Sequence, residues 1–170
     1  MSQTNDAQNR TITIQRTFDA PIALVWKAWT QAEHIVKWWG PKGMETDIVF
    51  HEFKVGGKWK YIMAMPNGHD FIAEGEYQEI NEPNKLVTTA NFLPMTEGVT
   101  MEVLLEANGN QTDFTFNVIH PTEEYKLQQE KMGVYNGWGS VFNQLAEFLA
   151  NQVINQYQQQ NKTENEDNDM

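Results

Sequence analysis

Residues 44–119 contain six runs in which apolar and polar side chains alternate, and this pattern constrains the fold more than any other feature of the chain. Alternate side chains of a strand point to opposite faces of a sheet. We therefore expect strands near residues 44–52, 58–65, 70–80, 84–92, 99–107 and 111–119. The runs are separated by Val55-Gly56-Gly57, Pro66-Asn67-Gly68, Glu82-Pro83-Asn84, Pro94 to Gly98 and Asn108-Gly109-Asn110. Such short connections predict an antiparallel meander.

A second pattern follows the meander near the end of the chain. Apolar side chains recur there at three- and four-residue steps, at Trp138, Val141, Phe142, Leu145, Phe148 and Leu149. This spacing predicts one long helix with a single apolar face, running to about Asn151. Gly137 and Gly139 each cost a helix roughly 1 kcal/mol relative to Ala. We interpret them as allowing close approach of the helix backbone to the sheet or to a ligand.

The first third of the chain predicts one more strand and two short helices. Residues 11–18 alternate as a half-buried strand, and Pro21 then suits a helix start. Thr30-Gln31-Ala32-Glu33 has the form of a capping box, so a second helix is expected to begin there and to end at Gly40-Pro41. Farther along the chain, Thr122 predicts another helix start, and Gly133 an interruption or bend.

This order of elements predicts an α+β fold with a curled antiparallel sheet of six or seven strands. The C-terminal helix is the one element long enough to cover the concave face of the sheet. We expect a single domain over residues 11–154, a flexible N-terminus over residues 1–10, and a disordered tail rich in Gln, Asn and acidic residues over residues 155–170.

Charge and composition exclude several classes of function. The formal net charge of −11 disfavours nucleic acid and anionic lipid as partners, because both require clustered Lys and Arg. There are no cysteines, so thiol nucleophiles and thiolate metal sites are excluded. No apolar run approaches the roughly 18 residues of a membrane span, and no signal peptide is evident. We expect a cytoplasmic protein without membrane insertion; the oligomeric state remains open.

The polar residues predict no catalytic residue, metal or cofactor. The four histidines, His34, His51, His69 and His120, have no spacing typical of metal ligands. Ser140 lies in the predicted helix, outside any nucleophile motif. Glu74 and Glu76 share a strand face and could act as acid and base inside a cavity, but a solvent-facing position is the simpler interpretation. Catalysis therefore stays an alternative to binding.

The aromatic side chains are the strongest functional signal. The apolar strand faces and the helix should bring together a set that either fills the core or lines a cavity for an apolar ligand. Methionines Met44, Met63, Met65, Met95 and Met101 add adaptable surface. The candidate ligand-binding residues are Trp38, Trp39, Trp59, Tyr61, Met63, Phe71, Met101, Phe114, Phe116, Trp138 and Phe142.

An ordered series of short motifs resembles a known superfamily. The series comprises Arg16-x-Phe18-x-Ala20-Pro21, Val25-Trp26, Trp29-Thr30, Trp38-Trp39-Gly40-Pro41, Gly56-Gly57-x-Trp59, Asn67-Gly68, Gly75-x-Tyr77 and Gly137-Trp138. It resembles the START-like, Bet v-type, polyketide-cyclase group known as the SRPBCC superfamily. Within that group the chain is most similar to proteins like the C-terminal domain of the activator of the heat-shock chaperone ATPase. The resemblance covers about residues 11–150.

The resemblance implies a helix-grip fold with a cavity between the sheet and the long C-terminal helix. The superfamily includes lipid carriers, natural-product binders, cyclases and oxygenase domains, so the resemblance leaves the activity open. Our first hypothesis is binding of a small hydrophobic or aromatic molecule, with no cofactor. The alternatives are a cyclase- or hydrolase-like enzyme that uses the same cavity, and an interaction module for a heat-shock chaperone.

Overall fold

The computed structural model describes residues 4–40, 44–64 and 68–168. Its centre is one antiparallel sheet of seven strands, in the order β1-β7-β6-β5-β4-β3-β2. The strands are β1 (Thr11–Phe18), β2 (Thr46–His51), β3 (Lys58–Ala64), β4 (Asp70–Asn81), β5 (Lys85–Leu93), β6 (Thr96–Asn108) and β7 (Gln111–Ile119). The predicted meander is confirmed, and β1 joins the sheet by pairing with β7.

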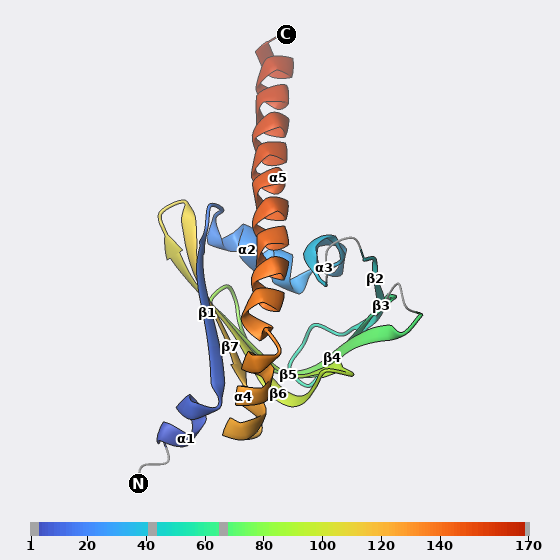
Figure 1. Ribbon diagram of the computed structural model, residues 1–170. Helices are drawn as coiled ribbons and strands as arrows, with labels where there is room; N and C mark the ends of the chain where they lie inside the picture. Colours follow the sequence, from blue (N-terminus) through green and yellow to red (C-terminus); the bar gives the residue numbers. More distant parts are fainter. Residues whose placement is uncertain (1–3, 41–43, 65–67, 169–170) are drawn as a thin grey trace.

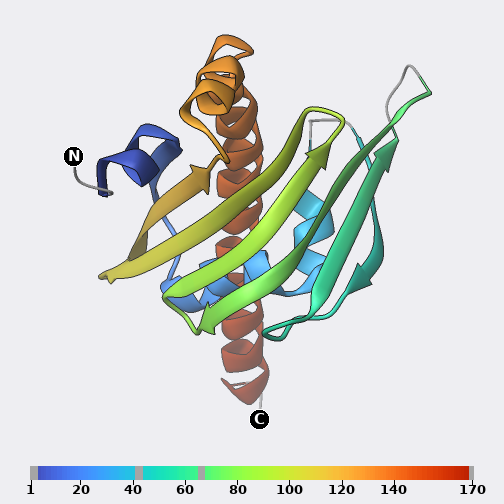
Figure 2. The same cartoon turned by 90° about the horizontal axis from the view of Figure 1, so that it is seen from below.

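Five helices complete the described part of the chain. They are α1 (Thr4–Asn9), α2 (Ile22–Thr30), α3 (Ala32–Trp38), α4 (Glu123–Lys131) and α5 (Val134–Asn168). The sheet curls around α5, with α2 and α3 near the middle of this helix (Figures 1 and 2). This arrangement confirms the predicted helix-grip fold. No helix of the described residues is long and apolar enough to cross a membrane.

The helix boundaries follow local chemistry, with one exception to our expectations. Thr122 caps α4 as predicted, because its Oγ1 accepts a hydrogen bond from the backbone N–H of Tyr125 at 3.1 Å. Gly133, at φ +85°, separates α4 from α5. The predicted capping box at Thr30 is wrong. The hydroxyl of Thr30 instead donates to the carbonyl of Trp26 at 2.8 Å, one turn back in α2.

Both ends of the chain carry more helix than we expected. Helix α1 occupies part of the segment predicted to be flexible, and the hydroxyl of Thr11 donates to the carbonyl of Ala7 at its end. Helix α5 continues to Asn168, through most of the segment predicted to be disordered. No Gly or Pro follows Gly139, and Gln, Glu and Lys are good helix formers, so nothing in the sequence ends the helix earlier.

The turns between strands that the structure describes agree with the prediction, except at the start of β6. Strand β6 begins at Thr96, three residues earlier than expected, because Thr96 pairs with Phe92 across a tight turn at Pro94 and Met95. Most of the predicted break Pro66-Asn67-Gly68 lies outside the described residues, and so does Met65.

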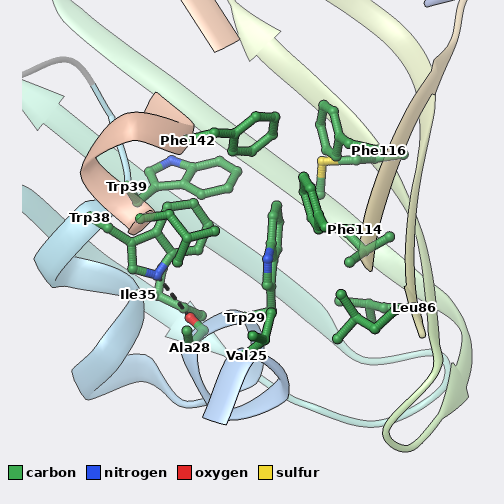
Figure 3. Close-up of a cluster of buried hydrophobic side chains, with 14 of the residues drawn as sticks. Val25, Ala28, Trp29, Ile35, Trp38, Trp39, Leu86, Phe114, Phe116 and Phe142 are labelled. Atoms are coloured by element: carbon green, nitrogen blue, oxygen red, sulfur yellow. Dashed lines mark hydrogen bonds between the residues drawn. The ribbon is translucent and has the colours of Figure 1, made fainter. Parts of the chain in front are cut away.

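The core lies between the sheet, α5 and the pair α2 and α3. Trp29 of α2 is at its centre and is 3% exposed. Its ring centroid lies 4.7 Å from that of Trp38 and 5.8 Å from that of Phe114, so it joins the short helices to the sheet (Figure 3). The indole N–H of Trp38 donates to the carbonyl of Ala28 at 2.9 Å (Figure 3). This packing fills one end of the space between sheet and helix.

Candidate ligand-binding site

The other end of that space holds a cavity of about 240 Å³. Its walls come from the end of α3, strands β3 to β5, the β5–β6 turn, α4 and α5. The lining residues are mainly apolar, and they are Trp39, Gly40, Met63, Phe71, Phe92, Met95, Thr96, Gln129, Met132, Gly133, Val134, Gly137, Trp138 and Val141. An apolar cavity of about 150 Å³ can bind benzene, so this one has room for a somewhat larger molecule.

Helix α5 forms one wall through Trp138 and Val141, which are one turn apart. The ring of Trp138 packs against Phe116 and Phe92, with centroids 4.7 Å and 5.2 Å away. Trp138 is therefore both a core residue and a wall of the cavity. Gly137 also lines the cavity, but a Cβ atom there would meet nothing within 4 Å. Our interpretation of Gly137 as a point of close approach to the sheet is wrong, while close approach to a ligand stays a prediction.

Trp39 forms the part of the wall next to Trp138, with ring centroids 6.0 Å apart, and backbone hydrogen bonds hold the turn that carries it. The hydroxyl of Thr46 donates to the carbonyl of Trp39 at 3.0 Å, and the side-chain amide of Gln144 donates to the carbonyl of Gly40 at 2.7 Å. Gly40 has φ +88°, and a Cβ atom there would collide with the Sδ of Met63. The turn after α3 therefore requires glycine, and it directs the indole of Trp39 toward the cavity.

One end of the cavity is polar. Thr96 of β6 and Gln129 of α4 line it, and their side chains are joined by a hydrogen bond of 2.8 Å from Thr96 Oγ1 to Gln129 Oε1. The amide Nε2 of Gln129 donates to the carbonyl of Met95 at 3.2 Å. The lining residues that the structure describes include no Asp, Glu, Lys, Arg or His. The described lining can therefore offer neutral hydrogen bonds but no charge.

A second, much smaller space of about 20 Å³ lies on the other side of Trp39, which lines both. Behind it, the Oη of Tyr61 lies 2.9 Å from Nδ1 of His51, whose Nε2 donates to the carbonyl of Thr30 at 2.8 Å. Burial raises the pKa of the Tyr61 hydroxyl far above its usual value, and it raises that of Tyr77 as well. These hydroxyls stay protonated and serve as buried hydrogen-bonding groups.

The structure divides the eleven candidate residues into three groups. Trp39, Met63, Phe71 and Trp138 line the cavity. Trp38, Trp59, Tyr61 and Met101 line the small space beyond Trp39. Phe114, Phe116 and Phe142 line neither and are buried in the core around Trp29. All eleven therefore lie between the sheet and the helices. The three that pack around Trp29 belong to the filled core and not to the wall of a cavity.

Sequence reasoning missed several residues of the cavity wall. The sequence predicts a break between strands at Thr96, and Gln129 belongs to α4, whose sequence has no apolar face. Phe92 has the right chemistry and position on β5, and the alternation of that strand could have identified it. For Met95 the sequence predicts only adaptable surface. Nothing in the sequence distinguishes Gln129 from its exposed neighbour Gln128.

The remaining polar candidates lie away from the cavity. Glu76 is exposed and Glu74 is half-buried, while Ala73 and Tyr77 of the same strand are buried. The two acids therefore occupy the outer face of β4. Within residues 4–40, 44–64 and 68–168, no three His, Asp or Glu side chains gather as metal ligands would.

This combination of a curled sheet, a gripped helix and an apolar cavity between them defines a ligand-cavity fold of the SRPBCC type. Residues 19–150 match the family described as Activator of Hsp90 ATPase homolog 1-like protein. The matched segment is most of the chain, and the protein belongs to this family. A comparison with curated proteins found no match.

Solved structures of bacterial proteins share the fold over nearly their whole length. A protein from Arthrobacter aurescens is 26% identical, with a TM-score of 0.78 over 86% of this chain and 89% of its own. A protein from Nitrosomonas europaea is 25% identical, with a TM-score of 0.74 over 85% and 97%. A protein from Mycobacterium smegmatis, at 24% identity and TM-score 0.76, covers 86% and 95% and shows the fold alone.

Proposed function

We propose that this protein binds a small, mainly apolar molecule in the cavity between its sheet and α5. The observation that carries the proposal is the cavity of about 240 Å³ with aromatic walls at Trp39, Phe92 and Trp138. Ligand sites in proteins are concave, mainly apolar and supplied with few polar groups, and this cavity has those properties. A reaction of the cyclase or hydrolase kind would require an ionisable group at the cavity, and the described lining residues offer none.

The test is stabilisation of the protein by a panel of one- and two-ring aromatic compounds. A ligand at 100 times its dissociation constant should raise the free energy of unfolding by about 2.7 kcal/mol, because it binds only the folded state. Thermal unfolding followed by tryptophan fluorescence measures the effect. Quenching of the fluorescence of Trp138, which lines the cavity, provides a second signal of ligand binding.

A variant with a filled cavity serves as the control. Val141 is half-buried at the cavity wall, so Val141→Trp should occupy the ligand's space and abolish the stabilisation. Ala146→Trp adds the same side chain at an exposed position of α5 and should leave binding unchanged. If no compound stabilises the wild type, or if Val141→Trp binds as well as the wild type, the proposal is wrong.

Family membership favours a second candidate, a role as an interaction module for a heat-shock chaperone. Such a role would use an exposed surface and would not depend on the cavity. The ATPase rate of Hsp90 should then rise on addition of this protein, and equally on addition of the Val141→Trp variant. An unchanged ATPase rate and no binding in a pull-down would exclude this candidate.

A further inference from the structure

We infer that the ligand of this cavity is an uncharged aromatic molecule with a hydroxyl group, and that Gln129 and Thr96 bind this hydroxyl. The inference rests on the proposed function, since it names the chemistry of the molecule in the same cavity. Two buried polar side chains at one end of an otherwise apolar space carry it.

Gln129 has hydrogen-bonding capacity left over at the cavity. Its side chain is 6% exposed, although most of α4 is polar and solvent-facing. The carbonyl of Met95 can only accept, so Nε2 faces it and Oε1 faces the hydroxyl of Thr96. A side-chain amide has two N–H donors and two oxygen lone pairs. Among the described residues, one donor and one lone pair of Gln129 therefore remain for a ligand.

Thr96 completes the polar end of the cavity. It is 7% exposed, and its hydroxyl hydrogen is used in the bond to Gln129, which leaves the lone pairs of Oγ1 as acceptors. Gln129 and Thr96 together present both a donor and acceptors. A ligand hydroxyl both donates and accepts, so it matches this pair better than an ether or a simple hydrocarbon.

Hydrogen bonds connect α4 to the β5–β6 hairpin at the polar end of the cavity. The Oη of Tyr125 on α4 accepts from the backbone N–H of Glu97 at 3.0 Å, next to Thr96 in the β5–β6 hairpin. The bonds of Gln129 form a second connection between α4 and this hairpin. Since the donor and acceptors are already in place, little ordering cost remains for the ligand's hydroxyl.

The absence of charge at the described wall favours a neutral ligand. Two charged groups of α4 close in sequence to Gln129, Lys126 and Glu130, pair with each other at 3.1 Å and are not among the lining residues. A carboxylate in this space would lose its hydration without gaining a cation. The volume of about 240 Å³ fits a compound of two fused rings, by comparison with benzene in a cavity of about 150 Å³.

Calorimetric titration with 2-naphthol, naphthalene and 2-naphthoate tests the inference. The wild type should bind 2-naphthol about tenfold more tightly than naphthalene, as one or two good hydrogen bonds provide, and should bind 2-naphthoate most weakly. In Thr96→Val and Gln129→Met, which keep the shape but remove the polar groups, the preference for 2-naphthol should fall below about threefold. Affinity for naphthalene should be retained. Gln128→Met, at the exposed neighbour on α4, should behave as the wild type.

The possible outcomes separate this inference from the function on which it rests. Binding of naphthalene without a preference for 2-naphthol overturns the hydroxyl assignment but leaves the cavity's function intact. A preference that survives in both variants, or tightest binding of 2-naphthoate, overturns it too. Failure of all three compounds to bind a correctly folded wild type overturns the proposed function itself. Unfolding midpoints of the free variants verify that each one folds.

Discussion

At the scale of single residues, glycines of similar appearance in the sequence have different roles. Gly75 of β4 lies against the indole of Trp59, and an added Cβ atom would collide with the carbonyl oxygen of Thr89. Gly137 of α5 faces open space. Gly75 is therefore required by packing, whereas no protein contact requires Gly137, which lowers the helix propensity of α5.

Substitution of these two glycines by alanine should change stability in opposite directions. Gly75→Ala should lower the free energy of unfolding by about 3 kcal/mol, because the methyl group overpacks the contact between β4, β5 and Trp59. Gly137→Ala should raise it by roughly 0.5 to 1 kcal/mol. Urea unfolding followed by circular dichroism measures both. Equal effects of the two substitutions would contradict this assignment.

At the scale of elements, α5 combines three roles. It closes the core through Phe142, Leu145 and Leu149, it lines the cavity through Trp138 and Val141, and it extends beyond the sheet (Figure 1). Val153 is the last described residue of α5 that packs against the core, and Asn155 and Gln156 are exposed. Among the residues of α5 whose side chains the structure describes, the contribution to the core therefore ends near Val153.

Two truncations should distinguish these parts of α5. A chain that ends at Asn155 should keep the wild-type free energy of unfolding to within about 0.5 kcal/mol, as is usual for changes at exposed positions. A chain that ends at Gln144 loses Leu145 and Leu149, each worth about 2 to 5 kcal/mol, and should not fold cooperatively. Thermal unfolding of both chains provides the measurement. A large loss of stability in the longer chain would show that the distal helix packs on the fold.

At the scale of the whole molecule, two histidines in different parts of the fold make the stability depend on pH in the same direction. Burial lowers the pKa of His34 on α3 below its usual value, despite the opposing effect of Glu33. Burial likewise lowers the pKa of His120, which follows β7, although a hydrogen bond with the carbonyl of Arg10 opposes the shift. The folded protein therefore favours both rings in the neutral form.

The protein should consequently lose stability in mild acid. Between the lowered pKa values and the unfolded value near 6.5, the unfolded chain binds more protons, so stability falls as pH decreases through this window and levels off below it. The loss should be smaller in the double variant His34→Gln and His120→Gln. Urea-unfolding midpoints of the wild type and the double variant between pH 8 and pH 5 measure the two losses. Subtracting one loss from the other removes the contribution of the carboxylates, which both proteins share. Parallel profiles for the two proteins would refute the prediction.

The local pattern of the sequence was enough to predict most of the fold. Alternation over residues 44–119 and the helical spacing after Gly133 are short-range signals, and they specify strands, turns and the amphipathic face of α5 without knowledge of distant contacts. The fold class and the order of elements from β1 onward followed from local signals of this kind. The capping of α3 did not, because the hydroxyl of Thr30 can bond to more than one backbone group, and local competition decides between them. The full extent of α5 was not predicted either, although the sequence after Gly139 contains no Gly or Pro that would end the helix.

The site depended on tertiary structure, for a different physical reason. Aromatic side chains on the inner faces look alike in sequence, whether they fill a core or line a cavity. Trp29 inserts between Phe114 and Trp38 and so fills one end of the interior, while Trp39 and Trp138 stand at the edge of what remains. Gln129 becomes a cavity residue only because α4 docks on the β5–β6 hairpin. The sequence by itself determined which surfaces are apolar, and the packing of distant elements decided where space is left between them.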